Sequence, residues 1–284
     1  MLMLSRWVDA DTIIMNPNIP LDIFLPPAEF SHLHLLVTAD PHGLNNGVFY
    51  IKVHPWSVEL LSAVVAYRIY RPDTELQYRD QSALEDVLKE KHFKKNFLQL
   101  PQRWFNAIWG ELNDDSTRSF QVRRGDLLVH FPGHPQRDEI MRKFLDRAER
   151  HMSEWELDLE STSYPNEMKE FWLEQHEVLE TQRAEAQKAV KEAEELLGKV
   201  DSQMAAHHND LDSEDAEKID ERVKRLKLAL HDHIDDKEVV QEASDRLQDV
   251  PKPQPIISTY ECTNTRNRPP LPSAPSLTKP KKRS

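Results

Sequence analysis

The first 157 residues of this 284-residue chain predict an α/β fold, which a helical extension and a short tail follow. Through residues 1–157, short apolar runs of β character alternate with longer segments of helical periodicity. Beyond about residue 166, apolar side chains recur instead at the spacing of paired helices. We therefore divide the chain into an α/β domain (1–157), an acidic helical extension (158–250) and a Pro-rich basic tail (251–284).

The α/β domain begins with β-type segments that turn-forming residues separate. Residues 2–8 predict a buried strand that leads into Asp9. Residues 34–38 and 48–53 predict two further strands, and Asn45-Asn46-Gly47 between them is a tight-turn signal.

Helices and strands then alternate to the end of this domain. Pro55 opens the first helix, because proline suits the first helical turn, and a wide apolar face follows it. Asp80 starts the second helix, where a carboxylate can cap the helix and complement its dipole. Residues 97–100 and 127–131 predict strands, and residues 136–152 predict an amphipathic helix.

The extension is expected to be an α-helical hairpin or a loose coiled coil. A heptad-like seam runs from Met168 to Val200, although Gln and Ala fill half of its positions. A second helix is predicted over about residues 214–249, and residues 201–213 separate the two. From Pro251 the tail is rich in Pro, Ser and Thr, so we expect it to be disordered.

Composition excludes several classes of function. Residues 1–157 carry a net charge of −4, residues 158–250 carry −14 and the tail carries +6. The folded part therefore lacks the basic face of a nucleic-acid-binding protein. A single cysteine, Cys262, excludes an intrachain disulfide framework and a cysteine-based zinc site. The chain shows no signal peptide and no membrane anchor, so taken alone it is expected to be soluble.

The most informative motif is Asp9-Ala10-Asp11, which lies between two apolar runs. Two carboxylates at this spacing can point at one divalent cation, and a cation held by oxygen ligands can grip a diphosphate. The alternative is a solvated strand end with two acidic residues.

Four further blocks follow this motif in order along the chain: Leu44-Asn45-Asn46-Gly47-Val48-Phe49, His54-Pro55-Trp56-Ser57, Asp80-Gln81-Ser82-Ala83-Leu84 and Val129-His130-Phe131-Pro132-Gly133. Together the five blocks resemble glycosyltransferase family 34, the fungal galactosyl/mannosyltransferase family that is related to plant xyloglucan xylosyltransferases. The resemblance covers roughly residues 3–157.

This resemblance implies a GT-A fold, which is a Rossmann-like α/β domain. It implies retaining transfer of a hexose from a nucleotide sugar, UDP-galactose or GDP-mannose, to a glycan acceptor, with Mn²⁺ as the metal. Family members are Golgi membrane proteins with a lumenal catalytic domain. Only eight residues precede Asp9 here, where the family has its nucleotide-binding strands. We therefore expect this chain to represent the C-terminal portion of the domain.

The resemblance also assigns the metal ligands. Asp11 matches a direct metal ligand, and Asp9 matches a residue that binds the metal or the donor ribose. His130 matches the late histidine of the metal site, and a neutral imidazole suits a site with two carboxylates. On sequence alone, His130 could equally be a core histidine at the end of an apolar strand.

The remaining matches concern the donor sugar and its diphosphate. Asp80 and Gln81 match an acidic-Gln pair near the transferred sugar, where they fit a front-face mechanism based on positioning and electrostatics. The segment from Asn45 through Asn46 to Gly47 matches the lining of the donor-sugar pocket, although an unaided hairpin turn would explain it too. Gly133 and His134 lie where the family wraps the diphosphate. Plant members have Cys-Lys after this glycine, so Arg137 is a candidate replacement cation.

Two hypotheses follow for the whole chain. In the first, it contributes the C-terminal half of a Mn²⁺-dependent hexosyltransferase. In the second, it is an inactive remnant whose helical extension forms homo- or hetero-oligomers. Loss of metal-dependent donor binding on Asp11→Ala would support the first.

Overall fold

The computed structural model describes residues 4–110, 118–133, 135–206 and 213–249. The chain divides into two compact units, residues 1–179 and 180–284, and each unit is described here by itself. The first unit combines a small mixed sheet with helices, so the predicted α/β class is confirmed at this level. The described residues form six helices in all. The proposed tail, residues 251–284, lies outside the described part.

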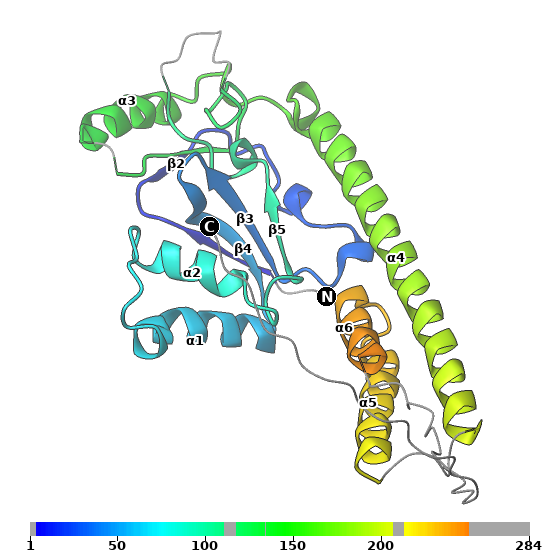
Figure 1. Ribbon diagram of the computed structural model, residues 1–284. Helices are drawn as coiled ribbons and strands as arrows, with labels where there is room; N and C mark the ends of the chain where they lie inside the picture. The colour runs from blue at the N-terminus through cyan, green and yellow to red at the C-terminus, as the bar shows by residue number, and fades with distance from the viewer. Residues whose placement is uncertain (1–3, 111–117, 134, 207–212, 250–284) are drawn as a thin grey trace, which may run out of the picture. The chain divides into compact units, whose positions relative to one another are not determined.

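The first unit is built on a four-stranded sheet (Figure 1). In spatial order its strands are β1 (Leu4–Val8), β4 (Gly43–Lys52), β3 (Leu35–Asp40) and β5 (Phe97–Leu100). β3 and β5 are parallel, and the other pairs are antiparallel. β2 (Thr12–Ile14) and β6 (Leu128–His130) form a separate antiparallel pair.

Two helices, α1 (Pro55–Tyr70) and α2 (Asp80–Leu88), pack on one face of the four-stranded sheet. Alternate strand residues point to this face, since successive side chains of a strand point to opposite sides. The resulting core consists of buried apolar residues from both layers and from the segment that follows α2: Leu35, Val37, Leu44, Trp56, Leu60, Tyr67, Ala83, Leu84, Val87, Leu88 and Phe93. Pro55 occupies the first helical turn, as its sequence position predicted.

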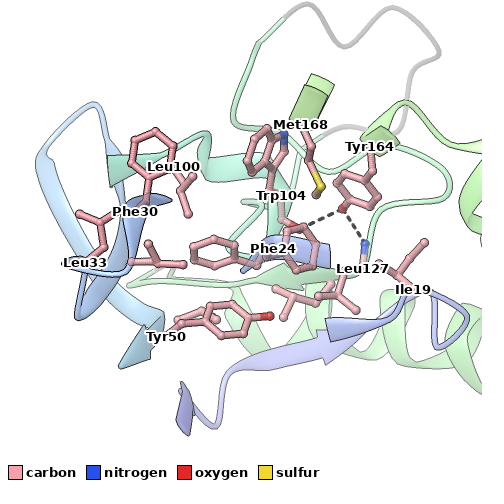
Figure 2. Close-up of a cluster of buried hydrophobic side chains, with 14 residues drawn as sticks. Ile19, Phe24, Phe30, Leu33, Tyr50, Leu100, Trp104, Leu127, Tyr164 and Met168 are labelled. Carbon is pink, nitrogen blue, oxygen red and sulfur yellow. Dashed lines mark hydrogen bonds between the residues drawn. The ribbon is translucent and has the colours of Figure 1, made fainter. Parts of the chain in front are cut away.

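The opposite face of the sheet carries a second core, which Figure 2 shows. The first turns of α4 (Tyr164–Ala206) contribute to it through Tyr164 and Met168. The Tyr164 hydroxyl accepts a hydrogen bond from the Leu127 N–H and donates one to the Trp104 carbonyl, each at 3.0 Å. Helical residues beyond 157 are therefore part of the first unit's core. Short 3₁₀ turns complete this unit: Leu21–Phe24, Ala28–Phe30, Gln102–Trp104 and Leu159–Ser161.

A third core surrounds the β2–β6 pair. α3 (Arg137–Glu149) packs there through Phe144, whose ring lies edge-on against Phe131 and Trp155. This packing holds the end of β6 in place, and β6 ends at His130.

Two local expectations in the first unit are wrong. In the described part of the strand expected over residues 2–8, Leu4–Val8 form β1, but this strand is not buried, because it lies at the sheet edge and leaves Trp7 55% exposed. The segment from Asn45 to Gly47 lies within β4 and is not a hairpin turn. The chain reverses instead between Asp40 and Gly43, which pair with each other across the β3–β4 hairpin.

The second unit contains the rest of α4 together with α5 (Ser213–Asp232) and α6 (Lys237–Gln248). Their apolar faces form one core: Ala189, Ala193, Leu197, Ile219, Val223, Leu226, Val240 and Leu247. The single helix predicted over residues 214–249 is thus two helices. α6 restarts where the Asp236 carboxylate accepts a hydrogen bond from the Val239 N–H, a favourable helix cap. Within the described part of the chain, no helix is long and apolar enough to cross a membrane.

Candidate functional site

Three predicted residues converge beside the β2–β6 pair. Asp9 and Asp11 lie in the three-residue connection between β1 and β2, and His130 ends β6. The Asp9 N–H donates to the Gly47 carbonyl at 2.8 Å, and the Asp11 carbonyl accepts from the Phe131 N–H at 3.0 Å. One ligand atom from each of Asp9, Asp11 and His130 lies within 4.8 Å of the others. The structure therefore brings together the side chains that the sequence singled out.

His130 is held in a buried and polar setting. Its side chain is only 3% exposed, with Nε2 3.4 Å from Asp11 Oδ1 and Nδ1 2.8 Å from Asn106 Oδ1. Burial lowers the pKa of His130, and the nearby carboxylates of Asp11 and Asp9 oppose this shift only in part. The imidazole is therefore neutral near pH 7, which is the form that binds metal ions.

Gly47 has a steric role beside this imidazole. A Cβ atom added at Gly47 would lie 2.1 Å from His130 Cε1 and 2.8 Å from both ring nitrogens. Real Cβ atoms do not approach so closely, so any larger residue would displace the ring. The absence of a side chain at Gly47 thus creates the space that His130 occupies.

The two aspartates have further partners. The Trp7 indole N–H donates to Asp9 Oδ1 at 2.8 Å, which orients that carboxylate. The Arg137 guanidinium donates to Asp11 Oδ2 at 3.2 Å, so the suggested phosphate-binding cation lies directly beside the acidic pair. Arg137 remains 46% exposed and can reach a ligand from solvent.

A second polar group lies at the start of α2. Asn46 donates through Nδ2 to Asp80 Oδ2 at 2.8 Å, and its backbone N–H donates to Gln81 Oε1 at 3.5 Å. Asp80 does not cap the helix as expected, because Arg79 occupies the cap position and Asp80 lies in the first turn. Its carboxylate binds Asn46 instead, while it still complements the helix dipole.

One segment of β4 connects both groups. Gly47 packs against His130, Asn46 binds Asp80 and Gln81, and Asn45 lies between β3 and the buried Asn106. The β3–β4 register shifts here, because Leu36 pairs with Tyr50 but Thr38 pairs with Asn45. Between these two pairs the chain advances by five residues in β4 but by only two in β3. Such a bulge-like irregularity changes the direction of side chains and is common beside functional sites.

Asn106 is a site residue that the sequence analysis missed. It is fully buried and bridges Thr38, Asn45 and His130 through its side-chain amide. The sequence offers little signal for it, because a lone Asn after a Trp-Phe pair carries no spacing pattern. A buried amide with three partners is recognisable only once the strands are assembled.

Of the two residues predicted to contact the diphosphate, Gly133 and His134, the structure describes only Gly133. Gly133 follows β6 closely, is exposed and has φ of +61°, a left-handed conformation that favours glycine. A Cβ atom there would meet no neighbour within 4 Å, so backbone conformation and not crowding favours glycine at this position. His134 lies outside the described residues.

The donor set fits a divalent cation. Two carboxylates and one neutral imidazole within 4.8 Å of one another supply oxygen and nitrogen ligands, which suit ions such as Mn²⁺. The buried imidazole also has an orienting partner on its far nitrogen, as metal-binding histidines normally do.

A comparison with known protein families found a match. Residues 27–140 match the model of the galactosyl transferase GMA12/MNN10 family. No curated protein matches the chain. The matched region contains Asn45, Asp80, Gln81 and His130, while Asp9 and Asp11 precede it. The expected resemblance is confirmed: residues 27–140 of this chain are similar to the GMA12/MNN10 galactosyl transferase family, and this similarity supports a glycosyltransferase by family resemblance.

Proposed function

We propose that the first unit carries the site of a retaining hexosyltransferase with a GT-A fold. It would move galactose or mannose from UDP-galactose or GDP-mannose to a glycan acceptor. The observation that carries this proposal is the convergence of Asp9, Asp11 and His130 beside a strand that also contacts Asp80 and Gln81. The family match supports the transferase class.

Asp9, Asp11 and His130 would hold Mn²⁺, and Asp9 would also reach the donor ribose. When bound, the ion supplies positive charge that stabilises the diphosphate leaving group. Arg137 adds a second cation beside Asp11, where it would contact the diphosphate oxygens. Gly133 and His134 would wrap the same group.

The donor sugar would lie along Asn45, Asn46 and Gly47. Asn46 ties Asp80 and Gln81 to β4, so their polar atoms are held at a fixed place relative to His130. Asp80 and Gln81 would stabilise positive charge at the anomeric carbon. Retention of configuration would then follow from a front-face transfer, to which the protein contributes positioning and electrostatics.

We propose that the protein acts at the lumenal face of the Golgi membrane. The helices of the second unit would act as a coiled-coil-like surface for homo- or hetero-oligomers. Their shared apolar core supports a stable helical module.

Isothermal titration of the 284-residue chain tests the site, first with Mn²⁺ alone and then with UDP-galactose or GDP-mannose in the presence of Mn²⁺. Asp11→Asn should abolish Mn²⁺ binding and donor binding together, because it removes a charged ligand. The exposed Asp73 provides a matched control, and Asp73→Asn should leave both unchanged. Equal Mn²⁺ affinity of the wild type and Asp11→Asn would refute the metal assignment. Absence of donor binding by the wild type would favour the alternative, association through the helical extension.

A further inference from the structure

We propose that Gly47, acting through Asn45 and Asn106, fixes His130 in the tautomer that carries its proton on Nδ1. Nε2 then presents a lone pair toward Asp11 and the cation. The purpose of this arrangement rests on the proposed metal site, but the tautomer itself follows from hydrogen bonds in the protein alone. Asn106 is accordingly a positioning residue, since it acts on the site only through His130.

The series of hydrogen bonds begins at the Gly47 N–H, a group that can only donate. A backbone N–H only donates, and the Gly47 N–H donates to Asn45 Oδ1 at 3.0 Å. At the other end of the same amide, Asn45 Nδ2 donates to Asp40 Oδ2 at 2.8 Å, and a carboxylate oxygen is an acceptor. Turning the Asn45 amide over would set two donors together at one end and two acceptors at the other. Its oxygen must therefore face Gly47.

The orientation of Asn45 in turn determines that of Asn106. Asn106 Nδ2 donates to Asn45 Oδ1 at 2.9 Å and to Thr38 Oγ1 at 2.8 Å, which uses both of its N–H groups. A reversed Asn106 amide would place its oxygen against Asn45 Oδ1, two acceptors in contact. The Asn106 oxygen therefore faces His130.

His130 completes the chain of hydrogen bonds. Its Nδ1 lies 2.8 Å from Asn106 Oδ1, and an amide oxygen can only accept, so Nδ1 must carry the proton. Asn45, Asn106, Thr38 and His130 are all buried, which leaves these groups few alternative partners in water. A neutral imidazole has one proton, so Nε2 is left unprotonated.

This choice matters because Asp11 favours the opposite tautomer. Asp11 Oδ1 lies 3.4 Å from Nε2, where it would accept a hydrogen bond from an Nε2–H group. An Nε2 atom that carries a proton has no lone pair for a metal ion. Asn106 thus competes with Asp11 for the single imidazole proton, and its shorter, buried hydrogen bond prevails. The same partner raises the basicity and fixes the ring orientation of a metal-binding histidine.

Nitrogen NMR of the metal-free chain with ¹⁵N-labelled histidine tests the tautomer, with the His130 signals assigned by their loss in His130→Gln. The wild type should show a protonated Nδ1 and an unprotonated Nε2. Asn106→Leu removes the acceptor and should move the proton to Nε2, toward Asp11. Asn106→Asp sets a second oxygen against Asn45 Oδ1 and should lose stability, but it keeps an acceptor oxygen facing Nδ1 and should retain the protonated Nδ1 of the wild type.

Two further variants separate this effect from general damage to the fold. Asn16 is equally buried and donates to the Gly125 and Leu157 carbonyls, so Asn16→Leu should lose stability but leave the His130 tautomer unchanged. If Asn106→Leu does not fold, Asn45→Ala leaves Asn106 in place without the acceptor that orients it. Asn45→Ala should then shift His130 toward the Nε2–H form.

Mn²⁺ titration distinguishes this inference from the proposed function on which it rests. Asn106→Leu should weaken Mn²⁺ binding by roughly 10- to 100-fold, the usual effect of removing a partner behind a metal-binding histidine. A wild-type Nδ1–H tautomer without Mn²⁺ binding would support the hydrogen-bond chain and refute the metal site. An Nδ1–H tautomer that persists in Asn106→Leu would overturn the role of Asn106, whatever the Mn²⁺ affinity.

Discussion

Replacing Gly47 by alanine should disturb His130 more than an alanine at any other glycine of this chain. Among the described glycines, only Gly47 has a neighbouring ring atom as close as 2.1 Å to the position of an added Cβ atom. The obstructing atom is His130 Cε1, which lies between the two ring nitrogens. The imidazole cannot tilt away freely, because its Nδ1 is bound to the buried Asn106.

The cost follows from two opposing terms. Overpacking a buried site by one methyl group costs about 1–3 kcal/mol. Gly47 lies outside the positive-φ region, so its backbone admits alanine, and the reduced entropy of the unfolded chain returns about 0.4–1 kcal/mol. We therefore expect Gly47→Ala to lower the free energy of unfolding by about 1–2 kcal/mol. Displacement of His130 should also weaken Mn²⁺ binding by roughly 10-fold or more.

Urea unfolding followed by tryptophan fluorescence reports the stability of the first unit, residues 1–179, because all six tryptophans lie between residues 7 and 172. Gly198→Ala is a matched control within α4, where an added Cβ atom meets nothing within 4 Å. It should raise the stability of the helical unit by up to about 1 kcal/mol and leave the fluorescence transition and Mn²⁺ affinity unchanged. Unaltered stability and unaltered Mn²⁺ affinity in Gly47→Ala would refute the packing of Gly47 on His130.

Three further predictions concern the first unit, each measured by urea unfolding with the same fluorescence signal. Tyr164→Phe should cost about 1–3 kcal/mol, because it leaves a buried backbone N–H and a buried carbonyl without their partner; a loss below about 0.5 kcal/mol would contradict this. Arg103→Met should cost about 3–5 kcal/mol, because it strands the buried Asp126 carboxylate without its guanidinium partner; a neutral effect would show that the ion pair contributes nothing. Burial, together with the neighbouring His54 ring, lowers the pKa of His34 from 6.5 to about 4, so the folded state resists its protonation. Stability should therefore be complete above pH 6.5 and fall as the pH drops toward 4, and His34→Phe should flatten this decline; an unchanged pH profile would exclude His34 as its source.

Much of the element order could be predicted from the sequence, because hydrophobic period and helix-start residues act locally. The apolar pattern after Pro55 identified α1, and the segment that begins at Asp80 identified α2. Errors arose where tertiary pairing overrides local preference. Asn-Gly usually favours a turn, but Gly47 lies in a strand because β1 pairs with β4 at Val8 and Val48 and holds the segment extended.

The candidate metal residues were predictable because each belongs to a block with a recognisable order along the chain. Asn106 was not, because its value depends on three partners that come from three separate strands. A residue letter specifies a donor and an acceptor but not the direction in which either points. The orientation of a side-chain amide can be assigned only from a partner that is always a donor or always an acceptor. Here that partner is the backbone N–H of Gly47.

The position of Gly47 gives one residue three separate functions in this site. Its missing side chain makes room for His130, its N–H orients Asn45, and its carbonyl accepts a hydrogen bond from the Asp9 backbone. A substituted residue keeps its backbone N–H and carbonyl, so only the two backbone hydrogen bonds could survive a substitution of Gly47. Gly47→Ala and Asn106→Leu therefore affect the same histidine by different routes, one through its space and the other through its proton. If His130 is a metal ligand, both variants should lose Mn²⁺ affinity, while only Asn106→Leu should move the proton to Nε2.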